Sequence, residues 1–162
     1  MLVIKDLIVR YGAIEALHGI SLHIDQGEIV ALIGSNGAGK STLLKTISGL
    51  VRPFSGSVIY NDTPLEKIPP NKIVEMGICQ VPEGRRVFSS MTVRENLLYY
   101  AMLYGIPRRR REHKVGELMD LFDLGEFARV TFDGLSTGTK QKLSLAKALL
   151  NEPELLFLDE PS

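Results

Sequence analysis

The chain has 162 residues, of which 19 are basic and 19 acidic, so its formal net charge is zero. This length suggests one domain, or one domain and a fraction, and the balanced charge gives no global basic field for non-specific nucleic-acid binding. The single cysteine, Cys79, excludes an internal disulfide framework and a multi-cysteine zinc site. No apolar run approaches the roughly 18 residues of a transmembrane helix, so we expect any membrane role to come through a partner.

The first half of the chain predicts strands that alternate with helices. Strands are expected at residues 2–9 and 17–24, and the apolar run at residues 29–33 predicts a short strand buried on both faces. A Gly-rich loop and a helix over residues 40–50 follow. The remaining elements are a strand at 55–61, a Pro-rich loop at 62–70, a short helix at 71–76 and a strand at 78–81.

The second half predicts three helices and a final strand. Thr92 and Glu95 have capping-box spacing and open a helix that runs to Tyr104. Two further helices are expected over residues 109–124 and 138–150, and a buried strand over residues 155–158. This alternation of strands and helices predicts an α/β domain with a mostly parallel sheet.

A glycine-rich motif follows the predicted strand at residues 29–33. It fits the pattern G-x-x-x-x-G-K-[ST] and consists of Gly34, Ser35, Asn36, Gly37, Ala38, Gly39, Lys40 and Ser41. Glycines let successive backbone amides point at phosphate oxygens, and the helix N-terminus adds positive potential. Lys40 is expected between the β- and γ-phosphates, the Ser41 hydroxyl on Mg²⁺, and Thr42 near the α-phosphate. The spacing is not G-x-G-x-x-G, which disfavours a dinucleotide fold.

Two carboxylates end the last predicted strand. Asp159 and Glu160 come directly after four apolar residues, where a buried strand emerges. Asp159 is expected to hold Mg²⁺ together with Ser41, and Glu160 to orient the attacking water. Taken alone, this pattern equally fits a strand that ends in surface acids.

Residues 135–141 read Leu-Ser-Thr-Gly-Thr-Lys-Gln and lie 23 residues upstream of Asp159, counted from Ser136. With this third motif the chain resembles the ATP-binding cassette (ABC) ATPases, whose signature is L-S-G-G-Q. The resemblance implies a P-loop NTPase fold: a RecA-like parallel sheet core with an N-terminal antiparallel β part and a helical subdomain. It implies one incomplete nucleotide-binding domain over residues 1–162. The ATP-binding core would comprise about 1–80 and 150–162, and the helical signature subdomain about 90–150.

The resemblance also implies roles for single residues. Tyr11 matches the aromatic residue that stacks on adenine, and Ser136 and Gly138 match groups that bind the γ-phosphate of ATP held by the other protomer. Residues 81–88 and 91–97 are similar to the loop that senses γ-phosphate and contacts the membrane subunit, with Glu83 where most members have glutamine. Its Pro-Glu-Gly-Arg-Arg version resembles the ATPases of branched-chain amino-acid uptake systems.

Two departures from the family pattern stand out. Thr137 replaces the first signature glycine, and a β-branched residue restricts the backbone conformations available at this position. The resulting Leu-Ser-Thr-Gly sequence is similar to that of exporter-type ATPases. Family domains continue beyond Ser162 with an Asp-containing interface loop, a switch histidine and a further strand. The strands at residues 29–33 and 155–158 would flank that further strand. We therefore expect them to face a gap between them, and the isolated chain to hydrolyse ATP poorly. His18, His23 and His113 are expected on the surface or satisfied in the core.

The predicted function is a Mg²⁺-dependent ATPase subunit that powers an ABC transporter, with branched-chain amino acids as the suggested solute class. The implied partners are a second copy or homologous ATPase subunit in a head-to-tail dimer and a transmembrane permease. No nucleic acid is expected, and the implied location is cytoplasmic, at the inner face of the cell membrane.

Other interpretations remain open at this stage. An exporter ATPase and a non-catalytic nucleotide-binding fragment both fit the motifs. A DNA-repair or chromosome ATPase is disfavoured because no heptads separate the phosphate loop from the signature. The basic residues at 108–111 are interpreted as a helix face answered by Glu112 and Glu117, in preference to a patch for nucleic acid or anionic lipid.

Overall fold

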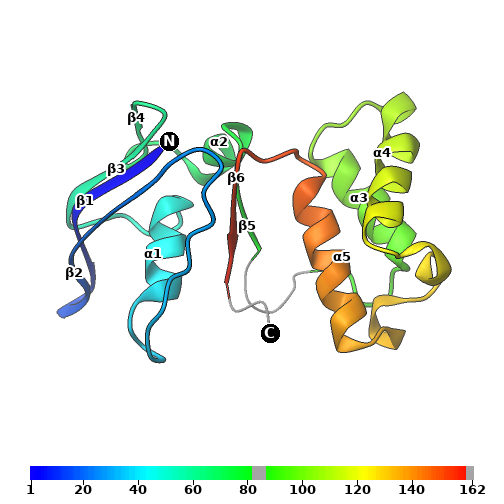
Figure 1. The fold of residues 1–162 in the computed structure, drawn as a ribbon, viewed down its shortest axis with the longest axis horizontal. Helices are drawn as coiled ribbons and strands as arrows, with labels where there is room; N and C mark the ends of the chain where they lie inside the picture. The colour runs from blue at the N-terminus through cyan, green and yellow to red at the C-terminus, as the bar shows by residue number, and fades with distance from the viewer. Residues whose placement is uncertain (82–86, 160–162) are drawn as a thin grey trace. The chain divides into compact units, whose positions relative to one another are not determined.

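The computed structural model describes residues 1–81 and 87–159 (Figure 1). The chain divides into two compact units, Met1–Ile78 and Cys79–Ser162, and each is described by itself. Within the described residues, every helix is too short or too polar to cross a bilayer.

The first unit contains a four-stranded antiparallel sheet. Its strands are β1 (Leu2–Tyr11), β2 (Ile14–Ile24), β3 (Ser55–Tyr60) and β4 (Thr63–Pro64), in the order β2-β1-β3-β4. The buried side chains of β1 alternate at Leu2 and Ile4 and again at Leu7 and Val9, and the register shift between Ile4 and Leu7 returns the strand to the same buried face. The expected antiparallel N-terminal part is confirmed, and the predicted loop at residues 62–70 contains the short β4.

Two helices accompany this sheet. Helix α1 (Lys40–Ile47) buries Leu43, Leu44 and Ile47, and α2 (Pro70–Glu75) buries Ile73. Helix α1 is shorter than predicted because Gly49 adopts a positive φ of 72° just after it. A Cβ on Gly49 would lie 2.7 Å from Ile73 Cδ1, so this glycine also permits close approach to α2.

The predicted buried strand at residues 29–33 is wrong for this structure. The segment is irregular, and its apolar side chains are exposed, with Ile29 at 101% and Ile33 at 96%. A strand forms only when a neighbour satisfies its backbone N–H and C=O groups, and neither sheet of the described residues includes a partner for this segment. Local apolarity therefore cannot by itself make the strand.

The second unit contains a pair of strands and a helical bundle. Strands β5 (Ile78–Val81) and β6 (Leu155–Leu158) pair, and the Asp159 amide donates to the Val81 carbonyl at 3.0 Å. The carboxyl ends of both strands therefore meet at one edge, which is the parallel arrangement.

Three helices form the bundle: α3 (Val93–Leu103), α4 (Arg108–Leu121) and α5 (Thr137–Leu149). Two 3₁₀ turns, Gly125–Phe127 and Phe132–Gly134, connect α4 to α5. Fully buried side chains from all three helices and the connection form one core, namely Val93, Leu97, Ala101, Val115, Leu124, Leu143 and Ala146. The predicted helices are confirmed, with ends displaced by up to three residues.

The capping box predicted at Thr92 is present. The Thr92 hydroxyl accepts from the Glu95 amide at 3.2 Å, and the Glu95 carboxylate accepts from the Thr92 amide at 2.8 Å. The Thr92 hydroxyl also donates to this carboxylate, at 2.8 Å, and the amide and hydroxyl bonds together lower the pKa of the Glu95 carboxyl group. The start of α3 is thus set by its own sequence.

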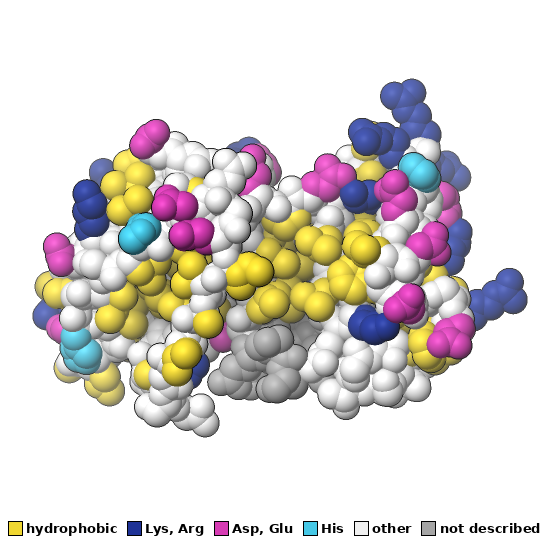
Figure 2. All heavy atoms as spheres, viewed as in Figure 1, with side chains coloured by type: hydrophobic (Ala, Val, Ile, Leu, Met, Phe, Trp, Pro, Cys, Tyr) yellow, Lys and Arg dark blue, Asp and Glu magenta, His cyan; other side chains and the backbone are white. Residues whose placement is uncertain are grey.

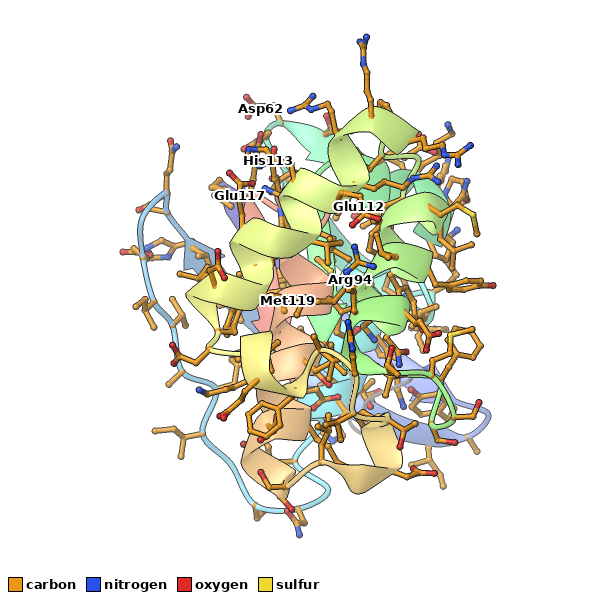
Figure 3. All side chains as sticks on the ribbon, turned by 90° about the vertical axis from the view of Figure 1, so that its right-hand side faces the viewer. Asp62, Arg94, Glu112, His113, Glu117 and Met119 are labelled. Atoms are coloured by element: carbon orange, nitrogen blue, oxygen red, sulfur yellow. The ribbon has the colours of Figure 1, made fainter. Side chains whose placement is uncertain are left out.

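The expected neutralisation of residues 108–111 by Glu112 and Glu117 is wrong. Glu112 of α4 instead pairs with Arg94 of α3, and Glu117 lies 3.5 Å from His113 (Figure 3). Arg94 lies beside α4 because the two helices pack against each other, a contact that spacing along α4 cannot reveal.

Candidate nucleotide-binding site

The glycine-rich loop lies immediately before α1 in the first unit. Gly37 and Gly39 have positive φ values of 85° and 88°, and Gly39 is the N-cap of the helix. The Ala38 amide donates to the Ser35 carbonyl at 3.1 Å, and the Leu43 amide donates to Gly39 at 2.9 Å. The loop therefore turns sharply into the helix, leaving the first amides of α1 available to an anion.

Gly39 is required by two independent features of the loop. Besides its positive φ, a Cβ at this position would lie 2.6 Å from Leu17 Cδ2 and 2.8 Å from the Ala16 carbonyl oxygen. Both neighbours belong to β2, so the strand passes directly against the loop. A backbone carbonyl held in a sheet has little freedom to move away.

We expect Gly39→Ala to weaken nucleotide binding by at least about tenfold, because left-handed strain and the β2 contact both displace the loop. Titration with a fluorescent ATP analogue measures the loss. The matched control is Gly19→Ala, since Gly19 also has a positive φ, of 76°, but has open space around its Cβ position. Equal affinity for both variants and the parent would contradict the role of the close approach.

Lys40 is folded back over this loop. Its Nζ donates to the carbonyl oxygens of Gly34 at 2.8 Å and Ser35 at 3.0 Å. The ammonium group therefore lies at the concave side of the loop, where it can exchange two carbonyl partners for phosphate oxygens. Ser41 and Thr42 occupy the next two positions of α1 and are half-buried. This set of amides, ammonium and hydroxyl oxygens fits a phosphate with a hard cation.

Tyr11 is the last residue of β1 and is 47% exposed. Tyr11 pairs with Ile14 across the β1–β2 hairpin. Ala16, two residues after Ile14, is the residue whose carbonyl oxygen lies against Gly39. In Figure 1 the hairpin turn and the start of α1 point to the same lower end of the first unit. Stacking of Tyr11 on adenine remains a prediction.

The signature residues lie at the start of α5 in the second unit. Ser136 is the N-cap, and its Oγ accepts from the Thr139 amide at 3.2 Å. Leu135 is buried in the bundle core, whereas Ser136, Thr137 and Gly138 are exposed. Thr137 is the first residue of α5, and a β-branched residue adopts this helical conformation readily. The restriction of backbone conformation expected from replacing glycine by threonine therefore causes no visible distortion of the helix start. An exposed, Ser-capped helix N-terminus suits a phosphate group.

Asp159 follows β6 and is buried, at 8% exposed. It lies where the carboxyl ends of β5 and β6 meet, the edge at which parallel sheets bind ligands. Glu83 and Glu160 lie outside the described residues. The structure thus brings residues 34–42 together on one turn, and it places Ser136, Gly138 and Asp159 at element ends in the other unit.

Two of the three histidines pair with nearby carboxylates on the surface. His18 bonds to Glu15 at 2.9 Å on the β1–β2 hairpin, and His113 faces Glu117; both are exposed. In residues 1–81 and 87–159, no group of three His, Cys, Asp or Glu side chains is placed to hold a metal ion.

Sequence analysis missed the role of Asn96. Its side chain is 1% exposed, its Oδ1 accepts from the Phe88 amide at 2.9 Å, and its Nδ2 donates to three carbonyls. These carbonyls belong to Phe88, Met91 and Thr92, at 3.0, 3.2 and 3.1 Å. Asn96 therefore holds the backbone of residues 88–92 against the first turn of α3. An Asn within a capping-box helix gives only a weak signal of such a role.

We expect Asn96→Ala to lower the free energy of unfolding by about 2–3 kcal/mol, because buried backbone groups lose their partners. Urea unfolding followed by circular dichroism gives the value. Asn71→Ala, at an exposed position of α2, is the control and should change stability by less than about 0.5 kcal/mol. A similar small change for both variants would show that water replaces the Asn96 bonds.

Comparison with known families places these observations in context. The family described as "ABC transporter" matches residues 17–162. Among curated proteins, the chain is 42% identical over 165 residues to the high-affinity branched-chain amino acid transport ATP-binding protein BraG of Pseudomonas aeruginosa, covering 100% of this chain and 69% of that protein. It is 39% identical to the methionine import ATP-binding protein MetN 2 of Rhodococcus jostii, covering 90% and 43%.

Solved structures agree with this assignment. The ATP-binding cassette MJ0796, in a dimeric post-hydrolysis state bound to ADP and Pi, superposes with a TM-score of 0.86 at 25% identity, covering 100% of this chain and 75% of that chain. An ATP-binding subunit of an ABC transporter gives a TM-score of 0.84 at 35% identity, covering 99% and 66%. The chain thus spans about two thirds to three quarters of these two solved chains.

Proposed function

The chain belongs to the ABC transporter family and is similar to its ATP-binding subunits. We propose that it binds Mg²⁺-ATP and contributes to the ATP hydrolysis that drives transport. The observation that carries this proposal is the loop at residues 34–40. Two glycines in the left-handed region curve it, and the Lys40 ammonium lies over its carbonyls. This arrangement is typical of loops that bind phosphate groups.

The proposed chemistry divides the tasks among a few residues. Backbone amides of the loop and α1 hold the β-phosphate, and Lys40 balances charge that develops between β- and γ-phosphates. The Ser41 hydroxyl and the Asp159 carboxylate would hold Mg²⁺, which neutralises phosphate charge when it is bound. Glu160 orients the water that attacks the γ-phosphorus in line, so that ADP leaves as inorganic phosphate forms. Tyr11 would stack on adenine, and Glu83 would lie beside the γ-phosphate.

The proposed partners are a second ATPase subunit and a membrane permease. Ser136 and Gly138 are exposed at the N-terminus of α5, where they can meet the γ-phosphate of ATP held by a second copy or a homologous subunit, head to tail. The relative MJ0796 was solved as a dimer, which supports this arrangement. Binding to a permease would hold the protein at the cytoplasmic face of the membrane.

Branched-chain amino acids are the proposed solute class. The relative BraG is named for their transport, and the Pro-Glu-Gly-Arg-Arg sequence at residues 82–86 points the same way. MetN 2, at 39% identity, is named for methionine import, so an amino-acid importer is the broader statement. The exporter-type alternative rests on Thr137 in the signature.

Equilibrium binding of ATP and release of phosphate, measured on the same preparation with and without Mg²⁺, test the proposal. Binding together with Mg²⁺-dependent turnover supports an ATPase. Binding without turnover would favour the alternative of a nucleotide-binding fragment. Absence of binding by a folded chain would contradict the proposed function.

A further inference from the structure

The first turn of α4 concentrates positive charge in a chain whose net charge is zero. Its first four residues are Arg108, Arg109, Arg110 and Arg111, and Lys114 follows one turn later. Pro107 supplies no side-chain cap, and no acidic residue lies in this turn. Cations at a helix N-terminus oppose the helix dipole, so this arrangement is unfavourable unless an anion approaches it.

Within the described part of the chain, no ion pair joins a carboxylate to this cluster, named here the α4 arginine cluster (residues 108–111), although Arg110, after Lys114, helps to lower the pKa of Glu152. Glu112 pairs with Arg94, and Glu152 pairs with Lys114. Arg111 donates from Nε to the Ile106 carbonyl at 2.7 Å. Among residues 1–81 and 87–159, the side chains of Arg108 and Arg109 make neither a hydrogen bond nor an ion pair, and both residues are exposed. Dark-blue side chains accordingly project from the upper right of the view in Figure 2.

Exposed apolar side chains end α3, the helix that precedes these arginines in the chain. Met102 and Leu103, at the end of α3, are 46% and 57% exposed. Met102, Leu98 and Tyr99 line a hollow of about 550 Å³ whose other walls are Arg108, Arg111 and Glu112. Apolar and cationic groups therefore share one surface at this end of the bundle.

We propose that the α4 arginine cluster, with Met102 beside it and the exposed Leu103 next to Met102 in the chain, contacts the anionic surface of a phospholipid membrane. Guanidinium groups form paired hydrogen bonds with lipid phosphates, and flanking apolar side chains partition into the interface. An anionic bilayer attracts such a cluster from several ångströms away. The inference rests on the proposed function only for the presence of a nearby membrane.

A membrane fits this surface better than a nucleic acid. The cluster is confined to one helix turn, whereas a duplex requires a basic stripe along its backbone. Among the described residues, Tyr99 is the one aromatic side chain that lines the hollow beside the cluster, whereas proteins that bind single strands stack successive bases on several such rings. A contact of this kind would orient the subunit on the bilayer, in addition to any binding to a permease.

The test is co-sedimentation of the whole chain with vesicles of phosphatidylglycerol and phosphatidylcholine, compared with pure phosphatidylcholine. We expect binding to the anionic vesicles that falls with added salt. The triple variant R108Q/R109Q/R110Q should lower the partition coefficient by on the order of a hundredfold. The control K5Q/K67Q/K72Q removes the same net charge from exposed positions of the first unit and should bind like the parent.

Further measurements separate the alternatives. M102S/L103S should weaken binding while keeping its salt dependence, and circular dichroism should show unchanged helix content in every variant. Equal binding to neutral vesicles, or equal binding by both triple variants, would overturn the proposal. Tighter binding to a DNA or RNA duplex through the same arginines would also overturn it. ATP affinity is measured in parallel without vesicles, so failure of the proposed function is seen separately.

Discussion

Replacing Lys40 by alanine is expected to weaken Mg²⁺-ATP binding by about 100-fold or more. The ammonium group reaches the carbonyls of Gly34 and Ser35 across the loop, so its position is set on the concave side before any nucleotide arrives. Its charge-assisted bonds to two phosphate oxygens contribute about 1.5–3 kcal/mol each, and alanine supplies neither. Isothermal titration with ATP in the presence of Mg²⁺ measures the change.

The control for this variant is Lys45→Ala. Lys45 is an exposed residue in the last turn of the same helix, so its removal changes net charge equally without touching the loop. Affinity of the Lys45 variant should match that of the parent. If the Lys40 variant bound Mg²⁺-ATP as tightly as the parent, the phosphate-loop interpretation would be abandoned.

Replacing Glu160 by glutamine is expected to leave ATP affinity within a few fold and to lower phosphate release by about 10²–10⁴-fold. Glutamine keeps the size of the side chain but cannot accept a proton from the attacking water. The residue follows Asp159, which lies at the carboxyl edge of the β5–β6 pair. Single-turnover phosphate release, in a preparation that hydrolyses ATP, provides the measurement.

Glu126→Gln is the matched control, because Glu126 is an exposed acid in the 3₁₀ turn Gly125–Phe127, away from the strand ends. It should hydrolyse ATP at the parent's rate. Equal turnover by the Glu160 variant would remove that residue as the water-orienting group, whereas loss of ATP binding would give it a structural role instead.

Local chemistry accounts for what the sequence predicted correctly. The start of α3 was predictable because Thr92 and Glu95 satisfy each other's backbone groups, and the loop before α1 because Gly37 and Gly39 can adopt positive φ. The motif around Lys40 was equally predictable, because binding a phosphate requires backbone amides, an ammonium group and a hydroxyl group at fixed spacing along the chain. Each of these features depends on residues within about one helical turn.

Features that depend on distant residues were decided only by the tertiary structure. Residues 29–33 have the composition of a buried strand but remain outside any described sheet, because a strand needs a neighbour that local sequence cannot specify. Asn96 forms hydrogen bonds with the backbone of residues 88–92 because folding buries its side chain beside Phe88. Glu112 forms its ion pair with Arg94 of α3 and not with the arginines of α4, the helix to which it belongs. Hydrogen bonds and ion pairs of this kind form between groups that packing brings together. Spacing along the sequence predicts only the pairs that form within one helix or strand.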